Sequence, residues 1–350
     1  MTGVLIALLV GMLALAGCGE AGDGDDKEAI VITDTQFQTL WINNAIAEFI
    51  IEEGYEYPVE IISASVPVMN QSLRSGESDL HLELWRFNMM EWYTEVTESG
   101  EVIDLGPIYD TARQGWYVPR YVVEGDEERG IEPMAPGLSS VFDLPDYWEV
   151  FEDPEDPNKG VFLNSIHGWD CTEINAIKME AYGLTDYYNI QYPGGAAALD
   201  TALVRAYERG EPIVAYYWEP TWLMGKYDFV MLDEPEYDPE VQSMIRRVID
   251  GDMEAEELDT ACAYQTHAVH KGINAELKDR APEVVDFVEA MNVGTEPLNE
   301  TAAYMETEDA TAEEAALWYF ENFQDRWRDW VPADVEERLE AALIEAGADL

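Results

Sequence analysis

Short apolar runs alternate with helical patterns from residue 29 onward, and this alternation restricts the possible folds more than any other feature of the sequence. The runs 29–32, 59–63 and 80–85 have the length and composition of strands, while helical patterns end near Glu53 and cover 67–74. Strands that alternate with helices usually pair in parallel, with helices on both faces of the sheet. The sequence therefore predicts an α/β fold with a mostly parallel sheet.

The same order returns in the second half of the chain. Strands are predicted at 161–164 and 213–217, and helices at 172–182 and 196–208. A stretch rich in Pro and acidic residues, about 124–159, lies between the two sets and is interpreted as a surface insertion. Because single hydrophobic cores stop growing near about 250 to 300 residues, a chain of 350 residues is expected to form two lobes.

The C-terminal part begins with a further β-like run, THAVHKGI at 266–273, and continues as helices. Three tryptophans, Trp318, Trp327 and Trp330, lie in the Trp-rich segment of these helices. Large rings in an amphipathic helix most often pack into a core. We expect these three residues to be structural.

The charge of the chain excludes one class of partner. Lys and Arg together number 19 against 73 Asp and Glu, which gives a formal net charge of −54. Such a surface repels phosphate backbones, so nucleic-acid binding is excluded. The acids are spread along the whole chain, which is typical of a solvated surface adapted to salty or extracellular conditions.

The first eighteen residues predict an exported, lipid-anchored protein. An uncharged apolar run ends at Leu15-Ala16-Gly17-Cys18, which has the pattern of a lipobox. We expect 1–18 to be a lipoprotein signal peptide with lipidation at Cys18, and 19–28 to be a polar tether. The protein would then lie in the cell envelope, on the outer face of the cytoplasmic membrane or in the periplasm. An uncleaved anchor helix is the alternative.

Three tryptophans lie at the ends of predicted strands, namely Trp85, Trp169 and Trp218. In open α/β sheets, ligands bind outside the carboxyl ends of the strands. Several indole faces around one cavity suit a quaternary ammonium, which cannot donate hydrogen bonds and is attracted by the ring quadrupoles. Hydrophobic plugging is the alternative for any single ring, but three rings in equivalent positions favour a binding site.

The segment 168–172, Gly-Trp-Asp-Cys-Thr, stands just ahead of a predicted helix. Asp170 is a candidate N-cap, and free backbone N–H groups at a helix N-terminus bind anions. One loop could thus offer a ring to a cation and amides to a carboxylate. The mature chain keeps two cysteines, Cys171 and Cys262, which could form a disulfide or stay reduced.

Four runs resemble one known family. FQTL at 37–40, ARQGW at 112–116, GWDC at 168–171 and YWEPTW at 217–222 are similar to the glycine betaine/proline betaine-binding proteins of ABC importers. The resemblance extends, with gaps, from about residue 29 to the end. It implies a type II periplasmic-binding-protein fold with two lobes joined by two crossing strands: 29–111 with 260–350, and 112–259.

The resemblance also implies a function without catalysis or a cofactor: an osmoprotectant-binding protein that acts as a monomer and delivers its ligand to a membrane permease. It implies a three-indole cage of Trp85, Trp169 and Trp218, with Trp116 as a further candidate. Backbone amides near Asp170 and Cys171 would hold the ligand carboxylate.

The sequence departs from the family pattern in two places. Met89 occupies the position of a family His that helps to hold the carboxylate, and Arg86 or Asn88 are candidates to replace it. Ser165 stands near the position of a family Cys that would bridge to Cys171. The choice among glycine betaine, proline betaine, carnitine and choline therefore stays open.

Two rival functions have weaker support. His267 and His270, with His81, could be zinc ligands of a metal-binding lipoprotein, but HxxH in a strand places its two rings on opposite faces. His167 and Cys171 could be a base and a nucleophile, but no third orienting group is recognisable nearby. Glu219 is interpreted as a solvated residue at the rim of the site.

Overall fold

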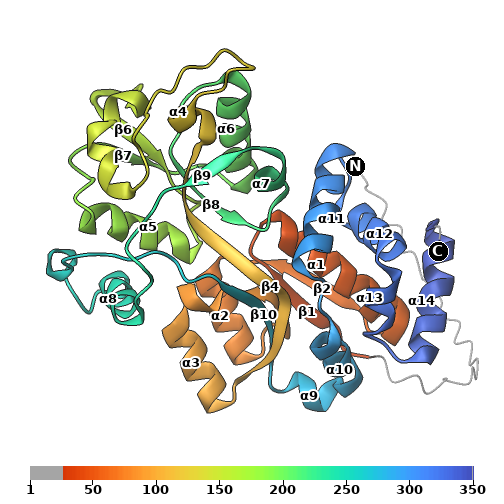
Figure 1. Cartoon of the computed structure of the whole chain (residues 1–350). Coiled ribbons are helices and arrows are strands. Elements are labelled where there is room, and N and C mark those ends of the chain that lie inside the picture. Colours follow the sequence, from red (N-terminus) through yellow and green to blue (C-terminus); the bar gives the residue numbers. More distant parts are fainter. Residues whose placement is uncertain (1–26, 349) are drawn as a thin grey trace, which may run out of the picture.

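The computed structural model describes residues 27–348 and residue 350 (Figure 1). The predicted signal peptide, the lipidation site Cys18 and most of the predicted tether lie outside the described residues. None of the helices in the described part of the chain combines the length and the apolar character that a membrane span needs.

The first lobe is built on three parallel strands. Strand β1 (Ile30–Asp34) pairs in parallel with β2 (Val59–Ser63) and with β3 (Leu80–Leu84), which confirms the strand–helix alternation read from the sequence. Figure 1 shows α2 and α3 on one side of these strands and α1 on the other. The helical elements of this part are α1 (Gln38–Phe49), its wider last turn η1 (Ile50–Gly54), α2 (Val66–Ser75), η2 (Arg86–Asn88) and α3 (Met90–Ser99).

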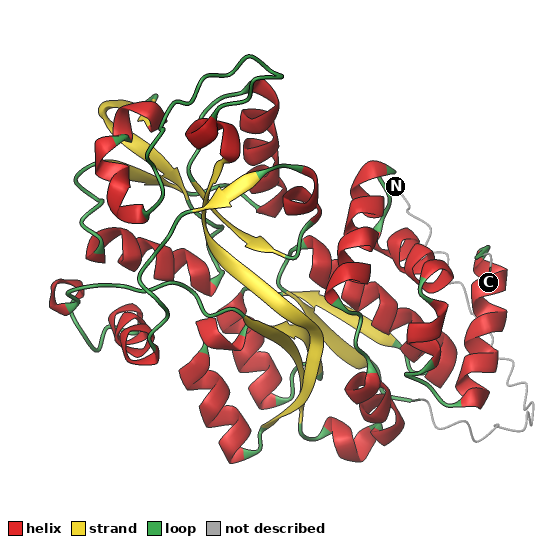
Figure 2. Ribbon diagram, viewed as in Figure 1, coloured by secondary structure: helices red, strands yellow, loops and turns green. Residues whose placement is uncertain are grey.

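One long strand joins the two halves of the sheet. Strand β4 (Val102–Pro119) pairs at its start with β10 (His267–Asn274), and at its end with β8 (Ala215–Glu219) and β9 (Phe229–Met231). All of these pairs are antiparallel, as is the pair of β10 with β3. The pairs that involve β4 and β10 are thus antiparallel, while each half keeps a set of parallel strands, and Figure 2 shows β4 passing from one half to the other.

The second lobe repeats the parallel arrangement. Strand β6 (Asp156–Leu163) pairs in parallel with β7 (Tyr188–Gln191) and β8, and antiparallel with β5 (Glu152–Asp153). Strand β6 begins five residues before the predicted start at 161, within the stretch predicted as irregular. The helical elements are α4 (Arg120–Glu124), η3 (Val141–Asp146), η4 (Trp148–Phe151), α5 (Asp170–Ala181), α6 (Ala196–Arg209), α7 (Trp222–Lys226), α8 (Pro239–Ile249) and η5 (Ala255–Glu257).

The C-terminal helices pack back onto the first lobe, where α12 and α11 contact α1. Trp327 and Trp330 are buried there, as predicted, while Trp318 is half-buried and stacks on Tyr304 with 5.0 Å between ring centroids. These helices are α9 (Leu277–Arg280), α10 (Pro282–Ala290), α11 (Thr295–Thr307), α12 (Ala312–Asn322), α13 (Gln324–Arg328) and α14 (Ala333–Ala346).

Candidate functional site

Aromatic side chains from the ends of several strands line one cavity between the lobes. Phe37 follows β1, Trp85 follows β3, Trp169 lies in the loop after β6, and Trp218 lies in β8. The cavity contains about 480 Å³ of space free of protein atoms, including its open mouth. Its position at the carboxyl ends of parallel strands is where α/β sheets bind ligands.

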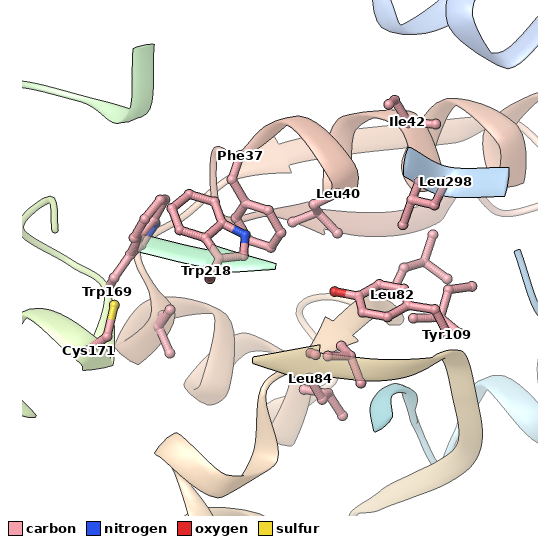
Figure 3. Packing of buried hydrophobic residues seen from close by; sticks show 14 of the residues in the cluster. Phe37, Leu40, Ile42, Leu82, Leu84, Tyr109, Trp169, Cys171, Trp218 and Leu298 are labelled. Atoms are coloured by element: carbon pink, nitrogen blue, oxygen red, sulfur yellow. The ribbon is translucent and has the colours of Figure 1, made fainter. Parts of the chain in front are cut away.

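Three of these rings stand nearly perpendicular to one another (Figure 3). The centroids of Trp169 and Trp218 are 5.1 Å apart with an angle of 87° between the planes. Phe37 lies 5.8 Å from Trp169 at 88° and 6.3 Å from Trp218 at 83°. Edge-to-face packing of this kind stabilises the group, and all three rings line the cavity.

The two lobes touch through this group. The indole Nε1 of Trp169 donates a hydrogen bond to the carbonyl of Thr35 at 2.9 Å, and the N–H of Val66 donates to the carbonyl of Gly168 at 2.9 Å. Gly168 has φ of 99°, and a Cβ there would lie 3.1 Å from the Cβ of Ser65. Glycine is therefore required by both the backbone conformation and the close approach of the lobes.

The fourth ring, Trp85, is held by a buried carboxylate. Its Nε1 donates to Oε2 of Glu83 at 3.3 Å, and Tyr109 OH donates to the same oxygen at 2.5 Å. Nδ2 of Asn43 donates to Oε1 of Glu83 at 2.8 Å. Glu83 is 1% exposed and lines the cavity. Burial raises the pKa of Glu83 to about 7, although the hydrogen bonds from Tyr109, Trp85 and Asn43 act in the opposite direction.

The N-terminus of α5 forms another part of the cavity wall. Asp170 and Cys171 are its first two residues, and a helix leaves the N–H groups of its first turn without intrahelical acceptors. The prediction that Asp170 is the N-cap is wrong, because Trp169 takes that place and the Asp170 carboxylate instead contacts Arg246 at 3.3 Å. Its Oδ2 is buried without a hydrogen-bond partner. Burial raises the pKa of Asp170 to about 6, against the effect of Arg246.

Amide groups complete the polar wall. Asn88 lines the cavity and exchanges hydrogen bonds with Gln114, of which Nε2 of Gln114 to Oδ1 of Asn88 is 2.9 Å. Tyr216 OH donates to Oε1 of Gln114 at 2.8 Å. Met89, at the position where the family has a His, also lines the cavity and is 3% exposed. The polar groups here are neutral or acidic.

The structure does not bring two of the predicted site residues to the cavity wall. Trp116 is fully buried in the second lobe, where its Nε1 donates to Oδ1 of Asn175 at 2.9 Å and its ring packs 4.5 Å from Phe162. Arg86 turns away and lies 3.9 Å from the carboxylate of Asp104. Trp116 lies within the long strand β4, three residues before its end, whereas Trp218 is the last residue but one of β8.

Both body cysteines are free thiols in the structure. Cys171 lines the cavity and its Sγ lies 3.3 Å from Oγ of Ser165, whereas Sγ of Cys262 lies 3.6 Å from the carbonyl of Asp238. The disulfide that the sequence left open is not formed.

Three of the histidines have separate partners. The ring of His267 packs against Trp85, Nδ1 of His270 is 2.7 Å from Asp104, and His81 bonds to Thr33. Among the described residues, no group of three or more His, Cys, Asp or Glu is arranged to hold a metal ion.

Several cavity residues were not predicted from the sequence, among them Phe37, Glu83 and Gln114. Phe37 belonged to the quoted FQTL run and follows β1 closely, so the strand-end argument that selected Trp85 would have selected it too. No sequence pattern would have selected Glu83, because an acidic residue within a predicted strand is normally expected to face solvent.

Residues 28–322 match the family described as the substrate binding domain of the ABC-type glycine betaine transport system. The chain belongs to this family. Members are solute-binding proteins of ABC transporters that act outside the cytoplasm. The family assignment from the four sequence runs is thereby confirmed.

Two curated relatives have low sequence identity to this chain over more than half of its length. The trimethylamine N-oxide-binding protein of Pelagibacter ubique (strain HTCC1062) is 24% identical over 323 residues, which span 91% of this chain and 95% of the relative. The glycine betaine-binding periplasmic protein OusX of Dickeya dadantii (strain 3937) is 23% identical over 211 residues, 58% of each chain.

Solved structures confirm the type II periplasmic-binding-protein fold. The glycine betaine, L-proline-binding protein ProX from Borrelia burgdorferi has a TM-score of 0.67 at 18% identity, covering 89% of this chain and 99% of its own. Lactococcal OpuAC, closed around glycine betaine, has a TM-score of 0.65 at 17% identity and covers 88% of this chain and 100% of its own.

Proposed function

We propose that this binding protein captures a small quaternary ammonium compound, with glycine betaine as the first candidate, and delivers it to an ABC permease for use as an osmoprotectant. Cys18 would carry the lipid that keeps the protein at the outer face of the membrane. Lobes of 29–111 with 260–350, and of 112–259, would close on the ligand like a hinged trap.

The observation that carries the proposal is the perpendicular group of Phe37, Trp169 and Trp218 on the same cavity as Trp85. Ring faces in several directions surround a methylated nitrogen with negative quadrupole potential from several sides. A primary ammonium would gain less in such a cage, because it keeps its water unless acceptors replace its hydrogen bonds. The arrangement thus favours methylated amines over polyamines.

The N-terminus of α5 supports a polar group at the other end of the ligand. The N–H groups of Asp170 and Cys171 would donate to a carboxylate, as helix N-termini do for anions. The Asp170 side chain lies beside them, however, and its ionised form would repel a carboxylate. The site would therefore hold glycine betaine less tightly once Asp170 is ionised.

Trimethylamine N-oxide is a second candidate ligand. The relative named for binding it is similar over almost the whole length of this chain. An N-oxide carries the same trimethylated nitrogen and a single compact acceptor in place of a carboxylate, so it fits the same rings. Choline and carnitine are further candidates with the same cationic group.

Isothermal titration calorimetry with the purified protein tests the proposal. Glycine betaine, proline betaine, trimethylamine N-oxide, choline, carnitine and spermidine are titrated separately, with zinc chloride as a further arm. Binding of at least one methylated amine is expected. Binding of spermidine alone, or of zinc alone, would overturn the proposal.

A further inference from the structure

Glu83 is a buried carboxylate without a cationic partner. Three donors from three elements surround it: Asn43 on α1, Tyr109 on β4, and Trp85 after β3. None of the Lys or Arg residues in 27–348 forms an ion pair with it. Burying an isolated carboxylate is costly, and hydrogen bonds offset only part of that cost.

The cavity that Glu83 faces lacks positive side chains as well. Among the described residues, its lining includes two acids, Glu83 and Asp170, and no Lys or Arg. Asp170 has Arg246 at 3.3 Å as a partner, so Glu83 is the acid whose charge is left uncompensated. A cation in the cavity would supply the missing charge.

We propose that Glu83 is the buried counter-anion of the ligand-binding cavity, and that it also orients the Trp85 ring toward the ligand. This proposal rests on the proposed function. It adds a specificity-determining residue that interacts with the cationic group of the ligand rather than with its polar end. Asn43, Tyr109 and Trp85 take three of the roughly four acceptor positions of the Glu83 carboxylate, and a quaternary ammonium has no N–H to donate, so Glu83 would act through its charge.

The ionisable groups near Glu83 come from its own strand, from β4 and from β10. On its own strand, His81 has a pKa lowered to about 4 by burial, and His267, beside Trp85, also has a pKa lowered to about 4 by burial. Tyr109 on β4 has a pKa raised well above its usual value by burial. On β10, His270 contacts Asp104, and Lys271, whose pKa burial lowers to about 8, donates to the carbonyl of Pro107.

The affinity for a cationic ligand should increase with pH. A cation binds more tightly when Glu83 is ionised, so affinity is highest above the pKa of about 7 and falls as pH decreases through it. By linkage, the cation lowers the pKa of Glu83 and releases protons on binding. If Glu83 instead donated a proton to an acceptor on the ligand, binding would take up protons and weaken with rising pH.

The test compares choline with its neutral isostere 3,3-dimethyl-1-butanol in wild-type protein, E83Q and D170N. E83Q should reduce the preference for choline over the isostere by about tenfold or more at pH about 8.5. It should also abolish the proton release measured by calorimetry in buffers of different ionisation enthalpy. In D170N, the change of choline affinity centred near pH 7 should remain, and a change nearer pH 6 should disappear.

Two further variants serve as a control and as a second test of the role of Glu83. E124Q removes an exposed carboxylate that pairs with Arg120 at 2.9 Å and does not line the cavity, so choline affinity should stay at the wild-type value. Y109F removes one donor to the Glu83 carboxylate and should move the midpoint of the pH dependence upward, which can be measured even where E83Q unfolds.

The counter-anion proposal would be overturned if E83Q kept both the wild-type preference for choline over the isostere and the wild-type pH dependence of affinity. It would also be overturned if the wild-type protein took up protons on binding. Absence of binding by every methylated amine in the wild type would overturn the proposed function instead. The two failures are distinguishable because the second needs only the unmutated protein.

Discussion

Trp169 and Trp218 show how much of the site depends on single side chains, since each contacts the other and Phe37. We expect W169A and W218A each to weaken binding of the preferred ligand by about 1 to 2 kcal/mol, because each ring faces a desolvated cation. Affinity is measured by calorimetry. W318F changes a half-buried Trp on α12, outside the cavity lining, and should bind like the wild type. Equal affinities in all three variants would mean that the cavity rings only pack.

Asp170 sets a preference between ligand classes. Above pH about 6 its carboxylate is ionised and repels a ligand carboxylate at the N-terminus of α5. D170N should therefore increase affinity for glycine betaine relative to choline, and the gain should grow as pH rises through 6. Competition titrations with the two ligands measure the ratio. D228N removes an exposed carboxylate that pairs with Arg120 at 2.8 Å, outside the cavity lining, and should leave the ratio unchanged. A ratio that shifts equally in both variants would contradict the role of Asp170.

At the scale of elements, α5 is tied to the chain after β9 by a buried ion pair. Nζ of Lys178 lies 2.5 Å from Oε2 of Glu234, and the two side chains are 1% and 3% exposed. Tyr182 OH donates to the same oxygen at 2.8 Å, and the Lys178 ammonium lies 4.1 Å from the ring centroid of Tyr264. The ion pair thus holds the helix that carries Asp170 and Cys171 against the segment that leads to α8.

Breaking this pair should destabilise the protein strongly. K178M leaves Glu234 as an unpaired buried charge, so the free energy of unfolding should fall by about 3 to 5 kcal/mol. Adding E234M to K178M should restore much of that loss. Denaturant unfolding of the ligand-free protein measures both. E124Q, which breaks the exposed pair of Arg120 and Glu124, is the control and should change stability by less than about 1 kcal/mol. A double variant no more stable than K178M would contradict the prediction.

At the scale of the whole molecule, the two lobes are in contact through Trp169 to Thr35 and Val66 to Gly168. If ligand binding shifts the population toward arrangements in which these contacts are formed, small-angle X-ray scattering should show a smaller radius of gyration with saturating ligand than without it. W169A, which loses the indole contact with Thr35, should show a smaller change. An identical radius with and without ligand would argue against hinge closure.

The net charge of −54 is also a property of the whole molecule. Like charges on a compact surface repel one another, and dissolved salt screens that repulsion. The melting temperature should rise as NaCl increases from about 0.05 M to about 1 M. KCl should act similarly, since screening does not depend on the cation's identity. A melting temperature that stays flat or falls would mean that the acids are compensated locally.

The sequence by itself determined the α/β alternation and the family, and it selected three tryptophans that line the cavity. Local patterns suffice for these, because a strand followed by a helix fixes where a strand ends, and the rings of Trp85, Trp169 and Trp218 lie at or just beyond such ends. The prediction of Val59–Ser63 as a strand is confirmed residue for residue for the same reason.

Only the tertiary structure decided which side chains share the cavity. Trp116 is excluded because β4 continues past it into the core of the second lobe, while Glu83 is included because its neighbours come from α1 and β4, far away in the sequence. Asp170 was predicted to be a helix cap, but in the structure its carboxylate pairs with Arg246, 76 residues away in the sequence. Burial and charge compensation depend on contacts between distant segments, and no local pattern of residues encodes them.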